Sequence, residues 1–129
     1  MHTLKTISAV VLIIGIIVAA GIISNNAFSS VSDKLDTHIT KIDEAATKEN
    51  WSTAEESLNK MQVDWSKNEK FWAILVDHME IDNIESTMSR LSKFIKSRDK
   101  SLTLGESALL HLYVKHIPQK ESFNISNIL

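Results

Sequence analysis

The hydrophobic positions are concentrated in one uninterrupted run near the N-terminus. Residues 7–23 are Ala, Val, Ile or Leu at every position except Ser8, Gly15 and Gly21. As an α-helix these 17 residues rise about 25 Å, which is close to the roughly 30 Å thickness of a hydrocarbon core. A core helix of a soluble protein carries a polar stripe, and this run has none. The pattern predicts a transmembrane helix that contacts the lipid bilayer through residues 7–23, within an anchor over residues 1–24.

A cleavable signal peptide is the competing interpretation of the same run. Val18-Ala19-Ala20 resembles a small-residue cleavage site, but the apolar run continues through Ile22 and Ile23. Cleavage there falls inside the run, so we favour an uncleaved anchor and keep the signal peptide as the alternative.

The charges around the run predict its orientation. Lys5 and the α-amino group precede it, whereas Ser24 to Ser32 is uncharged and the next charges, from Asp33 to Asp36, are slightly acidic. By the positive-inside rule the N-terminus is cytoplasmic. We expect a cell-membrane protein whose bulk, residues 25–129, lies outside as an extracytoplasmic domain.

Beyond the run the hydrophobic spacing is helical. Residues 25–129 contain one glycine, Gly105, and one proline, Pro118. A β-sheet needs such residues at its tight turns, so this segment is not expected to form one. Four stripes advance in steps of three and four residues: Val31, Leu35, Ile39, Ile42 and Ala46; Trp51, Ala54, Leu58, Met61 and Trp65; Ile74, His78, Ile81, Ile84 or Glu85, Met88, Leu91 and Ile95; and Leu102, Gly105, Ala108 or Leu109, Leu112 and His116.

Helix-capping residues divide these stripes into elements. Asn50 and Asp99 are typical N-caps, Ser66-Lys67-Asn68 interrupts the second stripe, and Pro118 is expected to end the last helix. The predicted helices cover residues 29–49, 51–67, 69–98 and 99–117. Short connections make neighbours antiparallel, so the fold class is all-α: a membrane helix followed by a small antiparallel bundle of three to four helices. The apolar tail, residues 119–129, is expected to dock in a groove of the bundle.

Composition excludes several classes of function. Residues 24–129 carry 13 basic and 16 acidic side chains, a net charge of −3, which is not the basic field of a nucleic-acid-binding protein. The absence of cysteine excludes disulfides, thiolate zinc sites and cysteine nucleophiles. Charged stretches such as Asp43-Glu44 are interpreted as ordinary solvated surface.

The densest polar feature follows the apolar stretch Phe71–Val76. We expect that stretch to be the most enclosed part of the longest helix. On one helix His78 falls on the apolar stripe and Asp82 lies one turn on, an arrangement that orients a metal ligand or a general base. The candidate binding cluster is Asp77, His78, Glu80, Asp82, Asn83 and, from the last helix, His116, with His111 as an alternative to His116.

The purely structural interpretation of this cluster is a hydrogen-bonded polar network that fixes the register of neighbouring helices. The Glu-x-x-His pattern of di-metal bundles is absent, because Leu75, Ala108 and Tyr113 stand three residues before the histidines. The chain also lacks a nucleophile elbow, a Gly-rich phosphate loop and an H-E-x-x-H motif. We therefore predict no catalytic residue, no metal and no cofactor. Trp51, Trp65 and Trp72 are interpreted as core residues rather than as a stacking platform for a sugar or base.

Several segments together resemble a small uncharacterised family. They are Trp51 followed by Ala54, Trp72, the run Leu75-Val76-Asp77-His78-Met79-Glu80-Ile81-Asp82-Asn83-Ile84, His116-Ile117-Pro118 and the closing Asn127-Ile128-Leu129. The family consists of short, single-anchor membrane proteins of spore-forming anaerobic bacteria and is known only as a domain of unknown function. The resemblance implies an N-terminal membrane anchor, a helical domain, and a multi-pass membrane protein as the expected partner.

Two functions follow from these patterns. The favoured one is a non-enzymatic interaction or accessory module, anchored in the membrane, for an integral membrane protein. The alternative is a metal- or ligand-binding sensory bundle centred on His78.

Overall fold

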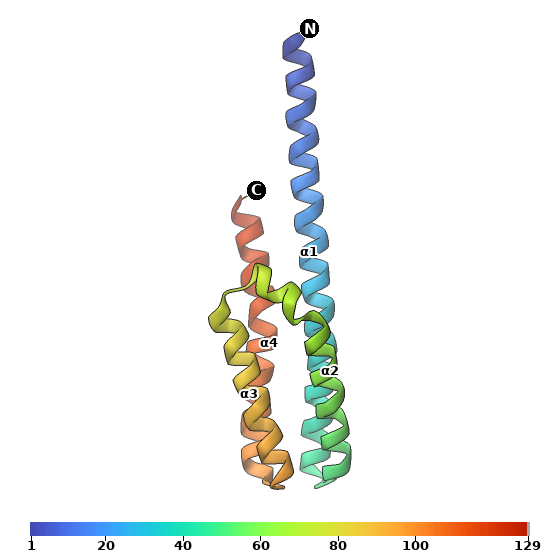
Figure 1. The fold of residues 1–129 in the computed structure, drawn as a ribbon, viewed down its shortest axis with the longest axis vertical. Coiled ribbons are helices and arrows are strands. Elements are labelled where there is room, and N and C mark those ends of the chain that lie inside the picture. Colours follow the sequence, from blue (N-terminus) through green and yellow to red (C-terminus); the bar gives the residue numbers. More distant parts are fainter. Residues whose placement is uncertain (129) are drawn as a thin grey trace.

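The protein is a bundle of four helices, one of which extends far beyond the others. A computed structural model describes the backbone of residues 1–128 and the side chains of residues 1–117. The helices are α1 (His2–Thr47), α2 (Trp51–Leu75), α3 (His78–Lys96) and α4 (Lys100–Ile128). They make the chain 92% helical, and residues 1–128 contain no strand, which confirms the all-α prediction. In Figure 1 the N-terminal half of α1 stands clear of the bundle.

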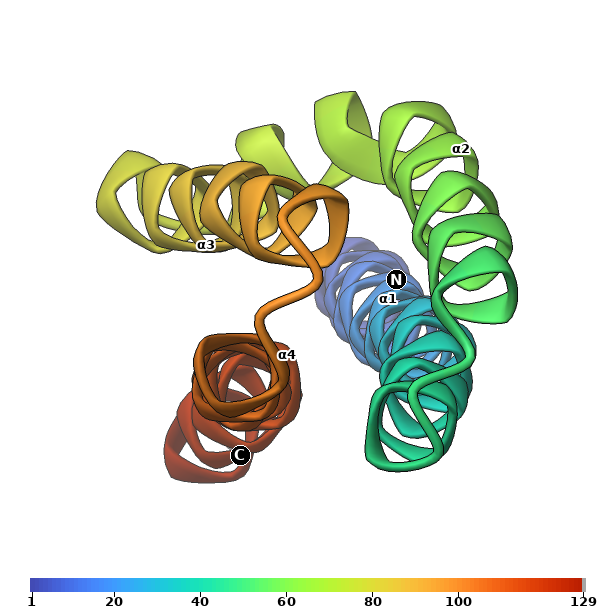
Figure 2. The ribbon, with the colours of Figure 1, turned by 90° about the horizontal axis from the view of Figure 1, so that it is seen from below.

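Consecutive helices run antiparallel, and α4 returns alongside α1. The helix α1 packs against both α2 and α4, and α3 packs against α4, while the contact between α2 and α3 is less extensive. Viewed from below, the four helices surround a common axis, with α1 beside α2 and α3 beside α4 (Figure 2).

The first helix does not break where the anchor was expected to end. A separate helix over residues 29–49 was expected, but α1 is continuous from His2 to Thr47. No glycine or proline occurs between residues 22 and 47, so nothing in the backbone interrupts the helical hydrogen bonds. The helix ends in a Schellman motif, in which Asn50 N–H donates to the carbonyl of Ala45 (2.8 Å) and Glu49 adopts a positive φ of 56°.

The break between α2 and α3 lies eight to nine residues later than expected. Ser66 and Asn68 do not cap a new helix, because their side chains bond back to backbone carbonyls of α2, Asn68 Nδ2 to Asp64 at 2.7 Å. The chain leaves the helix at Val76, which is extended (φ −116°, ψ 147°), and Asp77 caps α3 by accepting from Met79 N–H at 2.9 Å. The expected boundaries 51–67 and 69–98 were therefore wrong.

Pro118 does not end the last helix, because α4 continues to Ile128. A proline has no N–H, so the carbonyl of Val114, four residues earlier, lacks its helical donor. Ser32 Oγ, from α1, donates to that carbonyl at 2.8 Å. The neighbouring helix thus supplies the missing hydrogen bond. The expected docking of the tail depends on side chains of residues 118–129, which lie outside the described residues.

The core follows three of the four predicted stripes. The stripes of α1 and α2 are buried or half-buried throughout, and that of α3 is confirmed from Ile81 onward. The α4 stripe was wrong: Leu102, Gly105, Ala108, Leu112 and His116 are exposed, and the buried positions are Thr103, Ser107, Leu110, Val114 and Ile117. Leucines occur on both faces of α4, and two hydroxyl side chains on the buried face made that face look polar. The caps predicted at Asn50 and Asp99 are confirmed, at 3.3 Å and 2.9 Å.

Candidate functional site

The predicted polar cluster lies at the corner between α2 and α3. His78 is the first residue of α3 and is exposed. The expectation of an enclosed imidazole was wrong, because the break at Val76 changes the phase of the helix between Ile74 and Ile81. Within the stretch expected to be most enclosed, Trp72 and Val76 are buried, whereas Ile74 is 80% exposed.

The other members of the cluster do not converge on His78. Asp82 and His116 are exposed, and Glu80 and Asn83 are half-buried. Asn83 takes part through its backbone carbonyl, which accepts from Thr87 Oγ1 at 2.6 Å. Asp77 serves α3 as its N-cap rather than as part of a buried network. No group of three His, Asp or Glu side chains in the described part of the chain is arranged to hold a metal ion.

The aromatic residues belong to the core at this end of the bundle. The rings of Trp65 and Trp72 meet edge to face at 5.5 Å, and Trp72 meets Phe28 of α1 at 5.3 Å. Phe71 also lies 5.3 Å from Phe28, although part of its ring is exposed. The core interpretation is confirmed for Trp65 and Trp72, and Trp51 packs half-buried against the same core. These rings fix the α2–α3 corner against α1.

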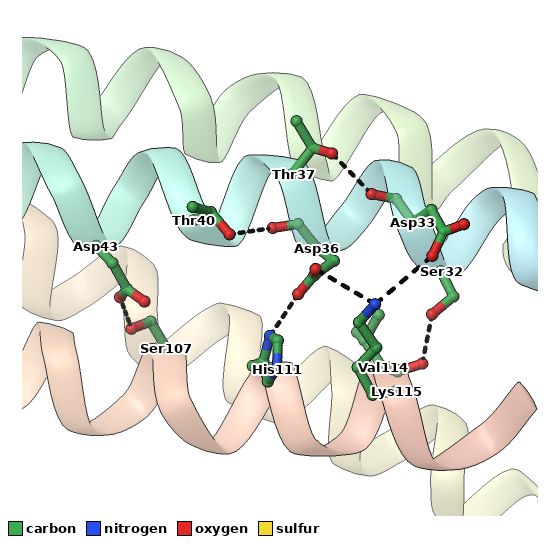
Figure 3. Close-up of polar contacts among 10 residues, drawn as sticks. All are labelled: Ser32, Asp33, Asp36, Thr37, Thr40, Asp43, Ser107, His111, Val114 and Lys115. Atoms are coloured by element: carbon green, nitrogen blue, oxygen red, sulfur yellow. Dashed lines mark hydrogen bonds and ion pairs between the residues drawn. The ribbon is translucent and has the colours of Figure 1, made fainter. Parts of the chain in front are cut away.

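A polar seam that the sequence reasoning missed joins α1 to α4 (Figure 3). Asp36 contacts Nδ1 of His111 and lies 3.4 Å from Nζ of Lys115, which is also 3.6 Å from Asp33. One turn further from the apolar segment, Ser107 donates a hydrogen bond to Asp43. The signal was present in the sequence. Asp33, Asp36 and Asp43 on α1 are spaced by three and seven residues, and their partners Ser107, His111 and Lys115 on α4 are spaced by four. Asp43 is therefore not ordinary solvated surface.

The seam helps to fix the register of the two helices. His111 and Lys115 are 50% and 40% exposed, and ion pairs at such positions contribute about 0–1 kcal/mol each. Together with the buried bond from Ser32 to Val114, they hold this length of α4 against residues 32–43 of α1.

Each remaining pair of neighbouring helices has a polar contact of its own. His38 Nε2 of α1 lies 2.7 Å from an oxygen of Asp64 of α2, and Arg90 of α3 pairs with Glu106 of α4. Between α2 and α3, Trp65 Nε1 donates to Glu85 at 3.3 Å. The negative charge of Glu85 also raises the pKa of the neighbouring Glu69. These polar contacts are specific to the pairs α1–α2, α3–α4 and α2–α3, and so favour the observed arrangement of neighbouring helices.

The described surface has open grooves between neighbouring helices. One groove follows the loose α2–α3 contact and is open to solvent. It is lined by Gln62, Trp65, Glu85, Met88, Ser89, Ser92, Lys93 and Lys96. A second open groove lies beside His38 and Asp64. The first groove is lined by one carboxylate, two hydroxyl and two ammonium side chains, and the second by one imidazole, one carboxylate and one ammonium.

The most distinctive surface is the apolar segment of α1. An 18-residue window of this helix has a mean hydropathy of 2.8, and none of the window is buried in the protein. It is the one helix among the described residues that is long and apolar enough to cross a membrane. The segment is thus compatible with a single membrane anchor.

Four packed helices, one bearing an exposed apolar segment, define an all-α protein with one possible membrane-spanning helix. The chain belongs to a family described as a domain of unknown function, DUF4363, whose family model matches residues 22–128. This span begins near the end of the apolar segment and covers the whole bundle, so the resemblance seen in the sequence is confirmed for the family itself. No curated protein and no solved structure matches the chain.

Proposed function

We propose that the protein is a membrane-anchored accessory module whose bundle binds an integral membrane protein outside the cytoplasm. The observation that carries the proposal is the complete exposure of the apolar segment. An aliphatic helix with no protein covering it is stable in lipid, and residues 7–23 match the thickness of a hydrocarbon core to within a turn or so.

The continuity of α1 supports a fixed placement of the bundle relative to the bilayer. The same helix that carries Ile23 continues to Phe28 and Leu35, which are both buried in the core. A helix without a break transmits its position as a rigid element, unlike a flexible linker. The bundle therefore stands directly on the membrane surface, on the side opposite Lys5.

An interaction role, rather than an enzymatic one, accounts for the surface that the bundle leaves uncovered. The outer face of α4 presents Leu102, Gly105 and Leu112, with the half-buried Leu109 between them, at steps of three and four residues, and Leu112 is 60% exposed. That spacing is the apolar seam with which one helix packs against another. We propose a helix of the membrane partner as its occupant.

We do not favour the sensory alternative centred on His78, because it required an enclosed imidazole facing a carboxylate. The exposed His78 at the start of α3 provides neither. The source in spore-forming anaerobic bacteria and the multi-pass nature of the partner stay predictions of the resemblance.

Photo-crosslinking in native membranes tests the proposal. A photoreactive residue at Leu112 is compared with one at Ser52, which is exposed on α2. We expect one integral membrane protein to crosslink at Leu112 and not at Ser52, and to copurify in mild detergent. A chain that is released from membranes by alkaline washing, or that crosslinks to nothing at Leu112, would contradict the proposal.

A further inference from the structure

The corner between α2 and α3 presents apolar side chains that the bundle does not bury. Ile74 is 80% exposed, Leu75 44% and Met79 70%, although Trp72 and Val76 beside them are buried. Resting on the proposed anchoring, we infer that this corner, residues 71–79, is a second membrane contact whose apolar side chains lie in the lipid headgroup region.

The level of the corner along α1 supports this inference. Phe28 contacts the rings of Phe71 and Trp72, both at 5.3 Å. Phe28 follows Ile23, the last residue of the apolar segment, by five residues, which is about 7.5 Å along a helix. The headgroup region adds about 5–7 Å on each side of the hydrocarbon core. The aromatic contacts therefore hold the corner at the outer edge of that region.

The direction of the helices brings the exposed side chains closer still. Since α2 is antiparallel to α1, the residues after Trp72 lie toward the apolar segment, and Figure 1 places the corner at the end of the bundle from which that segment emerges. The backbone of α4 passes the level of the corner and continues beyond it, as Figure 1 also shows. Ser32 lies opposite Val114 and Asp43 opposite Ser107, so the end of α4 at Ile128 is level with about residues 18–22 of α1.

The chemistry of the corner favours lipid over other occupants. Ile74, Leu75 and Met79 gain free energy by leaving water, and the membrane interface lies next to them. Asp77 and Asp82 add negative charge, which repels anionic headgroups, so the attraction is apolar rather than electrostatic. We therefore expect contact with zwitterionic lipid that does not weaken as salt is raised.

Single-cysteine labelling tests the inference cleanly, because the chain has no cysteine. Three apolar positions of similar exposure receive one environment-sensitive fluorophore each: Ile14→Cys in the apolar segment (53%), Leu75→Cys at the corner (44%) and Leu102→Cys at the opposite end of the bundle (49%). The full chain is placed in phosphatidylcholine vesicles that contain lipid spin labels either near the headgroup or at the end of the acyl chain. Ile74→Cys serves as a second corner position.

We expect the headgroup-proximal quencher to reduce the fluorescence at Leu75 and Ile74 but not at Leu102, and the acyl-end quencher to reduce it at Ile14. Quenching at Ile14 together with equal, low quenching at Leu75 and Leu102 would overturn the inference and leave the anchor intact. A blue shift at Leu75 without lipid quenching would also overturn it, because a second copy then covers the corner. No quenching at Ile14 would refute the anchor itself.

Discussion

Replacing Ser32 by alanine tests how the bundle accommodates a proline inside α4. Ser32 is 2% exposed, and its hydroxyl donates to the carbonyl of Val114, a fully buried residue. That carbonyl has no helical donor because residue 118 is proline. In the variant Ser32→Ala, a buried acceptor is left without a partner. The serine thus acts as a hydrogen-bond substitute for the N–H that Pro118 lacks.

The cost follows from the desolvation of one buried carbonyl. An unsatisfied buried polar group destabilises a protein by about 1–3 kcal/mol. For a domain of this size each kcal/mol lowers Tm by roughly 4–8 °C. Adding Pro118→Ala restores a backbone N–H four residues after Val114, so the carbonyl regains a donor. The double variant should therefore recover most of the loss, and the two substitutions should couple by about 1 kcal/mol or more.

The assay is thermal and urea unfolding of the full chain in mild detergent, followed by the helical circular dichroism signal. Ser29→Ala serves as the control, because Ser29 is exposed on the same helix. The reasoning is refuted if Ser32→Ala unfolds like the control. It is equally refuted if Ser32→Ala is destabilised by the same amount whether residue 118 is proline or alanine.

Three further predictions concern the α2–α3 end of the bundle. Asp77→Ala removes the N-cap of α3 and should lower the free energy of unfolding by about 1 kcal/mol. His78→Ala, at an exposed position, should change that free energy by less than about 0.5 kcal/mol. Equal effects of the two variants in urea unfolding would contradict the assignment of Asp77 as the N-cap. Trp72→Ala should cost about 3–5 kcal/mol, since its ring is fully buried against Phe28 and Trp65, and a small change in Tm would argue against that packing. Glu85 raises the pKa of Glu69, so the folded state holds that proton more tightly and loses stability as the pH rises through the raised pKa. The gain in stability of Glu85→Gln over the native chain should therefore grow as the pH rises above the ordinary pKa of a glutamate and then level off, and a pH-independent difference would contradict this.

Most of the fold was predictable because the determining signals are local. The stripe from Leu35 to Ala46 has one apolar face, and Asn50 and Asp99 have the short side chains that cap helices. The break between α2 and α3 was misplaced because Ser66 and Asn68 have the composition of a break but bond to their own helix. The prediction that Pro118 ends the last helix was wrong, because Ser32 of α1 donates the hydrogen bond that the proline cannot supply.

The candidate site was predicted less well, because burial is a tertiary property. His78 continues the apolar periodicity in sequence, but the extended Val76 rotates everything that follows it. The buried face of α4 contains Thr103 and Ser107, and the second is tolerated there because its hydroxyl has acceptors in hydrogen-bond reach, the carboxylate of Asp43 and the carbonyl of Leu104. Such pairings depend on which helices are neighbours, which hydrophobic periodicity alone does not specify.

Accessibility of two engineered cysteines tests the central claim, a bundle fixed outside the membrane by residues 7–23. The measurement is labelling of intact cells with a membrane-impermeant maleimide at Ser97→Cys, exposed at the far end of α3, and at Thr3→Cys, before the apolar segment. The account predicts labelling at position 97 in intact cells and at position 3 only after permeabilisation. Labelling at position 3 but not at position 97 in intact cells, or recovery of a chain shortened at its N-terminus, would contradict it.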